Sequence, residues 1–154
     1  MKKRILLIIT IIIIAFIFTH SLMSGTQSAV ESDSAFDIFD AITNFLHIPN
    51  VFTSLTIRKL AHFVEFAVLG IFLSATVYIF SGTFKNQIFK IPFLLLAIPV
   101  IDEFLQYFSE GRNSQVKDVL LDFGGCMFGF LITVLFVKLK TILHKPKDNE
   151  LKMQ

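Results

Sequence analysis

The sequence is short of charge and nearly free of cysteine. Only 17% of its 154 residues are Asp, Glu, Lys or Arg, while 54% are hydrophobic, a composition far from that of an average soluble domain. The formal net charge of +2 is too small to indicate a nucleic-acid partner. The single cysteine, Cys126, excludes an intramolecular disulfide. These shortages together indicate a membrane protein.

Long apolar segments take up most of the chain and predict an all-α membrane bundle. At roughly 20 residues per span, the length allows about four transmembrane helices. Residues 1–140 form the predicted membrane domain, and residues 141–154 a polar cytoplasmic tail. A basic start followed by a short apolar run also fits a cleavable signal peptide, so cleavage of the first span is left open. The predicted spans are residues 4–22, 57–80, 91–108 and 116–138.

Two segments of different composition lie between the first two spans. Residues 19–34 are rich in Ser, Thr, Gly and Gln and predict a loop. Over residues 35–46, apolar residues recur at helical spacing, which predicts a short amphipathic helix. Ser34 and Asp37 resemble a capping box, and Pro49 ends the pattern. We expect this helix at the extracytoplasmic interface, with a helical linker of no further role as the alternative.

The basic residues predict the orientation. Ten of the 14 Lys and Arg residues lie inside if both termini are cytoplasmic. The remaining four, Arg58, Lys59, Arg112 and Lys117, lie among carboxylates and are interpreted as members of a site. The chain is therefore predicted to be a multi-pass protein of the cell membrane with both termini in the cytoplasm. The ten inner residues are Lys2, Lys3, Arg4, Lys85, Lys90, Lys138, Lys140, Lys145, Lys147 and Lys152.

Polar residues open the second and fourth spans and close the third, all at the predicted outer side. Because a helix rises about 1.5 Å per residue, each polar run reaches on the order of 10 Å into the membrane from that surface. Charge within a bilayer is costly and must face the bundle interior or a wet cavity. The predicted ligand-binding residues are Arg58, Lys59, His62, Glu65, Asp102, Glu103, Gln106, Arg112, Asp118 and Asp122.

Two functions fit these residue types. Arg58, Lys59 and Arg112 can hold an anionic headgroup or a phosphate. A histidine with several carboxylates at one level can instead transfer protons. No serine or cysteine nucleophile signature stands out. The catalytic candidates are His62, Glu65, Asp102 and Glu103.

Other interpretations of the charged cluster are open. The charges can simply pair and lock the helices together, with Arg112 clamping a carboxylate. A proton or ion pathway is disfavoured because the inner halves of the spans have almost no ionisable groups. Mixed nitrogen and oxygen ligands are also present, but HxxE is not the HExxH of zinc enzymes, so neither a metal nor another cofactor is predicted. Those potential ligands are His62, Glu65, Asp102 and Asp122.

Smaller features have simple interpretations. Gly125 and Gly129 form a GxxxG pattern that can allow close helix contact. His20 and His47 lie at segment edges and are interpreted as surface histidines.

Two long motifs stand out in the polar segments. Residues 57–70 are IRKLAHFVEFAVLG, and residues 102–125 are DEFLQYFSEGRNSQVKDVLLDFGG. They resemble the R-K-x-x-H-x-x-E-[YF] and D-E-x-x-Q-x-F … G-R … D-x-x-x-[ND]-x-x-G patterns of the VanZ-like family of small bacterial integral membrane proteins. The Ser and Gln of residues 21–28 resemble an element that follows the first span in that family.

The resemblance implies a site more clearly than a reaction. The family takes its name from an accessory protein associated with teicoplanin resistance, and its motif positions fall on the ten residues above. The chain departs from the pattern at Phe66, Ser109, Glu110 and Asp122, where tyrosine, a turn with proline and asparagine are frequent. We expect a membrane protein that binds or modulates an envelope lipid, a cell-wall precursor or a lipoglycopeptide. The alternative is an intramembrane acid/base enzyme acting on such a lipid or lipid-linked precursor.

Overall fold

A computed structural model describes residues 2–47 and 52–143, which form helices joined by short turns. One short 3₁₀ helix, η1 (Lys85–Gln87), precedes α4, and no strand occurs in these ranges. The all-α class predicted from the sequence is confirmed. The α-helices are α1 (Lys2–Ser21), α2 (Gly25–Phe45), α3 (Ser54–Ser81), α4 (Lys90–Tyr107) and α5 (Val116–Leu143).

Three helices, α1, α3 and α5, are long and apolar enough to cross a membrane. The fourth predicted span corresponds to α4, which has 18 residues and includes Lys90, Asp102 and Glu103. A helix of this length extends over about 27 Å, close to the hydrocarbon thickness of about 30 Å. A count of four spans therefore stays a prediction, with α4 as the helix to be tested.

The start of α2 differs from the prediction. The helix begins at Gly25, so the loop predicted over residues 19–34 is wrong. Its first turn is closed by a capping box at Ser24 rather than at Ser34. The Ser24 hydroxyl accepts from the Gln27 backbone N–H, and the Gln27 side-chain oxygen accepts from the Ser24 backbone N–H. This reciprocal capping allows a polar sequence with little apolar periodicity to be helical.

The far end of α5 also differs. The helix continues to Leu143, into the predicted tail of residues 141–154. The rest of that tail, with Lys145, Lys147 and Lys152, lies outside the described residues, as does the predicted helix-ending Pro49.

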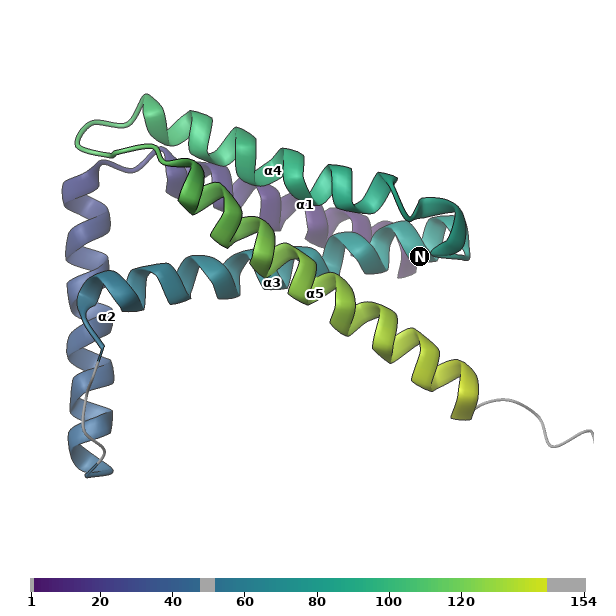
Figure 1. The fold of residues 1–154 in the computed structure, drawn as a ribbon, viewed down its shortest axis with the longest axis horizontal. Coiled ribbons are helices and arrows are strands. Elements are labelled where there is room, and N and C mark those ends of the chain that lie inside the picture. The colour runs from purple at the N-terminus through teal and green to yellow at the C-terminus, as the bar shows by residue number, and fades with distance from the viewer. Residues whose placement is uncertain (1, 48–51, 144–154) are drawn as a thin grey trace, which may run out of the picture.

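Figure 1 shows α2 lying across one end of the other helices. At this end the α1–α2 junction meets the α4–α5 turn, while the N-terminus and the α3–α4 connection lie at the opposite end. The Gly25 N–H donates to the Glu110 carbonyl over 2.8 Å. The Ser109 hydroxyl donates to the Ser21 carbonyl over 2.9 Å. These bonds fix the end of the molecule where the polar residues gather.

α3 and α5 form the most extensive helix contact. Gly125 faces the backbone of Phe63, Gly129 faces the backbone of Ala67, and Gly70 faces the backbone of α5. A Cβ at any of the three would collide with a carbonyl oxygen of the other helix. The close contact expected at the GxxxG pattern is confirmed, since only glycine allows backbones to approach this closely.

Apolar side chains cover much of the outside of the molecule, while three carboxylates, Asp102, Glu103 and Asp122, are buried within it. Phe45, Phe89 and Leu143 are 81%, 86% and 79% exposed, whereas Asp102 and Asp122 are buried. Lipid tails are as apolar as a protein core, so this distribution fits helices surrounded by lipid. The apolar core between the helices consists of Ile17, Phe66, Leu69, Ile91, Leu95, Ile98 and Cys126.

Candidate functional site

A cavity of about 450 Å³ opens beside the α4–α5 turn, at the end of the molecule crossed by α2. Its walls come from the start of α3, the turn itself and the start of α5, with one side chain from α4. The predicted site residues that line it are Arg58, Lys59, His62, Gln106, Arg112, Asp118 and Asp122.

A second cavity, of about 190 Å³, lies between α3, the end of α1 and the first half of α2. Its lining includes Glu65, His20 and Glu31, and it shares Arg58 and His62 with the larger cavity. The structure thus brings eight of the ten predicted site residues to two adjoining cavities. The other two, Asp102 and Glu103, line neither cavity.

Asp102 does not line the larger cavity, and two side chains donate hydrogen bonds to its carboxylate. One carboxylate oxygen accepts from the Ser21 hydroxyl of α1, and the other accepts from the Gln106 amide over 2.8 Å. The side chain is fully buried. A buried carboxylate requires such donors, because each oxygen has lost its hydration. The Ser21 bond also ties the end of α1 to α4.

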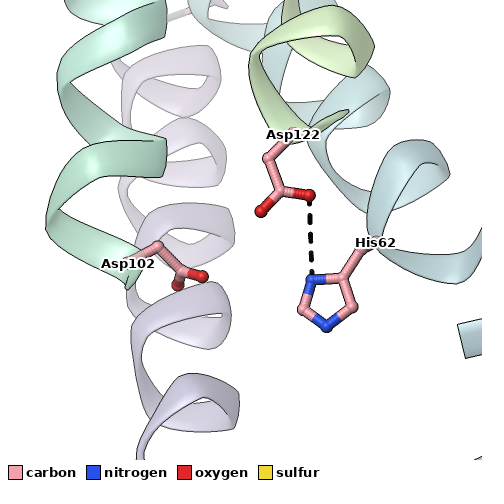
Figure 2. A group of neighbouring side chains, drawn as sticks. All are labelled: His62, Asp102 and Asp122. Carbon is pink, nitrogen blue, oxygen red and sulfur yellow. Dashed lines mark ion pairs between the residues drawn. The ribbon is translucent and has the colours of Figure 1, made fainter. Parts of the chain in front are cut away.

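His62 and Asp122 approach each other across the α3–α5 contact. Figure 2 shows both side chains turned toward each other, with Asp102 facing them from α4. The His62 Nδ1 lies 3.9 Å from the Asp122 Oδ1, which is longer than a hydrogen bond. Asp122 is buried, and its Oδ1 has no hydrogen-bond partner among the described residues.

Glu103 holds the α4–α5 turn. Its Oε1 accepts from the backbone N–H of Gln115, directly before α5, where a negative charge is favourable to the helix. Its backbone carbonyl accepts from the Ser114 hydroxyl over 2.6 Å. Gly111, at φ 74°, provides the left-handed residue of this turn. These contacts describe a carboxylate that positions the turn carrying Arg112.

Arg112 projects from the turn and has few partners. Its Nη2 donates to the His20 carbonyl over 3.4 Å, while Nε and Nη1 are buried without a hydrogen-bond partner in residues 2–47 and 52–143. No carboxylate in those ranges forms an ion pair with it, so the hypothesis of an Arg112–carboxylate clamp is wrong. Burial lowers the pKa of this guanidinium, and the charge of Arg58 lowers it further. A guanidinium nevertheless stays charged in proteins.

One basic residue of the cavity is paired. The Lys59 Nζ lies 3.5 Å from the Asp118 Oδ1, and both side chains are partly exposed. An ion pair of this kind contributes little stability. The lysine can therefore exchange this partner for a ligand at small cost.

The α1–α2 junction also contributes to the site, which was not predicted from the sequence. His20 is half-buried rather than a surface histidine, with its Nε2 2.9 Å from the Glu31 Oε2 and its ring centroid 6.2 Å from that of His62. Ser21 holds Asp102. The one signal for this segment was the Ser and Gln element of residues 21–28, which lay in a predicted loop.

The profile of one protein family matches residues 6–137, a stretch that includes all ten predicted site residues and the α1–α2 junction. The chain belongs to the VanZ/LLP1 family. Comparison with curated proteins and with solved structures gave no match. Membership in VanZ/LLP1 and the three long apolar helices together fit a membrane protein. The VanZ-like resemblance of the two sequence motifs is confirmed.

Proposed function

We propose that this VanZ/LLP1 chain binds the anionic headgroup of a membrane lipid or lipid-linked cell-wall component in the larger cavity. Arg58, Lys59 and Arg112 supply the positive charge. The observation that carries the proposal is the Arg112 guanidinium, which lines the cavity and has two buried nitrogens, Nε and Nη1, without a hydrogen-bond partner in the described residues. The protein acts by binding, at the extracytoplasmic side of the membrane.

An unpartnered buried donor is costly, and a charged one more so. A phosphate or carboxylate offers two oxygens at the spacing of the guanidinium fork, which makes a short, charge-assisted pair of bonds. Arg58 lines the same cavity, and Lys59, next to it in the sequence, has only a weak partner. The three cations therefore favour an anion with several oxygens, as found in a phosphate or pyrophosphate headgroup.

The position and size of the cavity agree with such a ligand. A volume of about 450 Å³ is within the usual range of about 300–1,000 Å³ for small-molecule sites. The cavity opens at the end crossed by α2, whose exposed apolar residues include Val30, Ile38 and Ile42. A helix in this orientation fits the membrane interface, where lipid headgroups lie. Lipoglycopeptides of the teicoplanin type carry lipid chains and carboxylates and are a further ligand class for the same site.

Native mass spectrometry of the purified chain tests the proposal. The probes are phosphatidylglycerol, a polyprenyl phosphate and, as the uncharged comparison, diacylglycerol. We expect the two phosphates to bind and Arg112→Gln to weaken them by about tenfold or more, the loss of one charge-assisted bond. Lys138→Gln removes the same charge from an exposed position of α5 that contributes to neither cavity, and should bind as the wild type does. Equal binding of the two phosphate lipids by wild type and Arg112→Gln would contradict the proposal.

A second candidate function is intramembrane acid/base catalysis. It is favoured by His62, whose Nδ1 faces the buried Asp122 across 3.9 Å, with Asp102 nearby. A histidine and a carboxylate in this arrangement can give and accept a proton in turn. The same samples decide between the two functions: lipids recovered chemically unchanged after incubation support binding alone, and a converted species supports the enzyme.

A further inference from the structure

Three helices each contribute one side chain to a small cluster beneath the larger cavity. The residues are His62 of α3, Asp102 of α4 and Asp122 of α5, and Figure 2 shows them converging on one space. One ligand atom from each lies within 4.8 Å of the other two. Their convergence is built into the fold, because the glycine contacts hold α3 and α5 together and the bond from the Gln115 N–H to Glu103 ties α4 to the start of α5.

The negative charge of the two carboxylates in the cluster is not balanced by an ion pair with Lys or Arg in the described residues. Asp102 is 0% and Asp122 is 2% exposed, so both carboxylates are shielded from bulk solvent. The Asp122 Oδ1 has no hydrogen-bond partner in the described ranges, and it points into the cluster toward His62. Two carboxylates with oxygens within 4.8 Å of each other repel each other strongly where water does not screen them. Neither Arg58 nor Arg112 forms an ion pair with either carboxylate in residues 2–47 and 52–143.

We propose that His62, Asp102 and Asp122 bind a divalent first-row cation, Zn²⁺ or Mn²⁺. Two carboxylates cancel the charge of such an ion, and the imidazole favours it over Mg²⁺ and Ca²⁺, which prefer oxygen ligands. Three protein ligands leave at least one position open, the arrangement of a catalytic rather than a structural site. His62 and Asp122 line the larger cavity, which gives the ion a path of entry and directs the open position toward the cavity.

The distance between the potential ligand atoms of His62 and Asp122 is close to the distance expected around a bound ion. Ligand atoms held about 2.0–2.2 Å from one ion lie about 3–3.5 Å from each other. The His62 Nδ1 and the Asp122 Oδ1 are 3.9 Å apart, so a small rotation of either side chain closes the site. Asp102 already has the outer contacts of a metal ligand, because Ser21 and Gln106 each donate to one of its oxygens. Each oxygen keeps a lone pair for the ion.

The inference is independent of the proposed lipid binding and is tested without lipid. The full chain, purified in detergent and stripped with a chelator, is titrated with Zn²⁺, Mn²⁺ and Mg²⁺ by calorimetry. We expect one Zn²⁺ or Mn²⁺ per chain and weaker or no binding of Mg²⁺. Asp122→Asn and His62→Gln should each weaken Zn²⁺ binding by about tenfold or more. His47→Ala and Asp37→Asn, two exposed positions of the α2 region, should bind as the wild type does.

Thermal unfolding keeps the test decisive if a variant folds poorly. Added Zn²⁺ should raise the melting temperature of the wild type and of both control variants, because the ion binds the folded state alone. The melting temperature of Asp122→Asn, once shown to be folded without metal, should not respond. Absence of saturable binding by the wild type, or unchanged binding by Asp122→Asn and His62→Gln, would overturn the proposal.

Discussion

The Ser21 hydroxyl makes one of the hydrogen bonds that join the end of α1 to the site. Ser21 is buried and donates to Asp102, so Ser21→Ala leaves a buried carboxylate oxygen without this donor. We expect the free energy of unfolding to fall by about 1–3 kcal/mol. Chemical denaturation in detergent micelles, without added metal, measures the change.

Thr19→Ala is the matched control for this prediction. The Thr19 hydroxyl donates to the Ala15 carbonyl of its own helix over 2.7 Å, at an exposed position. Its loss should change stability by less than about 0.5 kcal/mol. Similar effects of Thr19→Ala and Ser21→Ala would mean that the bond to Asp102 adds nothing beyond an ordinary surface hydroxyl.

That the polar and charged residues gather at one end of the helices was predictable, but their hydrogen-bond and ion-pair partners were not. Charge within apolar helices has to turn inward, so the sequence indicated the set. The pairing of Lys59 with Asp118, and of Glu103 with the Gln115 backbone, depends on how far each helix is rotated about its axis. Helix packing sets that rotation, and a single sequence contains no direct record of it. His20 was missed for another reason, because polar uncharged neighbours made its segment resemble a loop.

At the scale of helices, the glycine contact between α3 and α5 makes a sharp prediction. Gly129→Ala places a Cβ against the Ala67 carbonyl, and Gly70→Ala places one against the backbone of α5. Both replacements must push the helices apart. We expect each to lower the free energy of unfolding by about 1–3 kcal/mol, the usual cost of overpacking. Denaturation in mixed micelles is the measurement.

Gly124 provides a control on the same helix. The nearest atom to a Cβ at this position is a Phe63 ring carbon at 3.8 Å, an ordinary contact. Gly124→Ala should therefore be neutral or stabilising by up to about 1 kcal/mol, because alanine is the better helix former. If Gly124→Ala destabilised the chain as much as Gly129→Ala, the loss would not be specific to the close contact, and close packing would not explain the GxxxG pattern.

α2 shows where periodicity fails as a guide to helix bounds. Its second half, from residue 35, has apolar residues at helical spacing and was predicted as a helix. Its first half is polar and is helical because Ser24 and Gln27 satisfy two backbone groups reciprocally and because Gly25 is bonded to the α4–α5 turn. Capping and tertiary contact therefore decide the start of this helix. A capping box was expected in this segment, but at the wrong serine.

At the scale of the whole molecule, hydropathy predicted the order of the apolar helices α1, α3, α4 and α5, while the count of four spans stays a prediction. Apolar runs long enough to cross a bilayer have few alternatives to being helical, since lipid leaves no partner for an unpaired backbone. The crosswise direction of α2 and the oblique crossing of α5 over α3 were beyond the sequence. Both depend on side-chain packing between segments far apart in the chain. These two helix directions matter for function, because α2 and the start of α5 help to form the end of the molecule where both cavities lie.

The proposed site requires the α4–α5 turn to face outward and α4 to cross the membrane. Asn86→Cys and Glu110→Cys place exposed thiols on either side of α4, while the native Cys126 is fully buried. In intact cells we expect a membrane-impermeant maleimide to label Glu110→Cys alone. Asn86→Cys should be labelled only after permeabilisation, since Lys85 and Lys90 beside it favour the cytoplasm. Labels on the same side would mean that α4 does not span, and the reverse pattern would place the cavities in the cytoplasm, away from any extracytoplasmic headgroup.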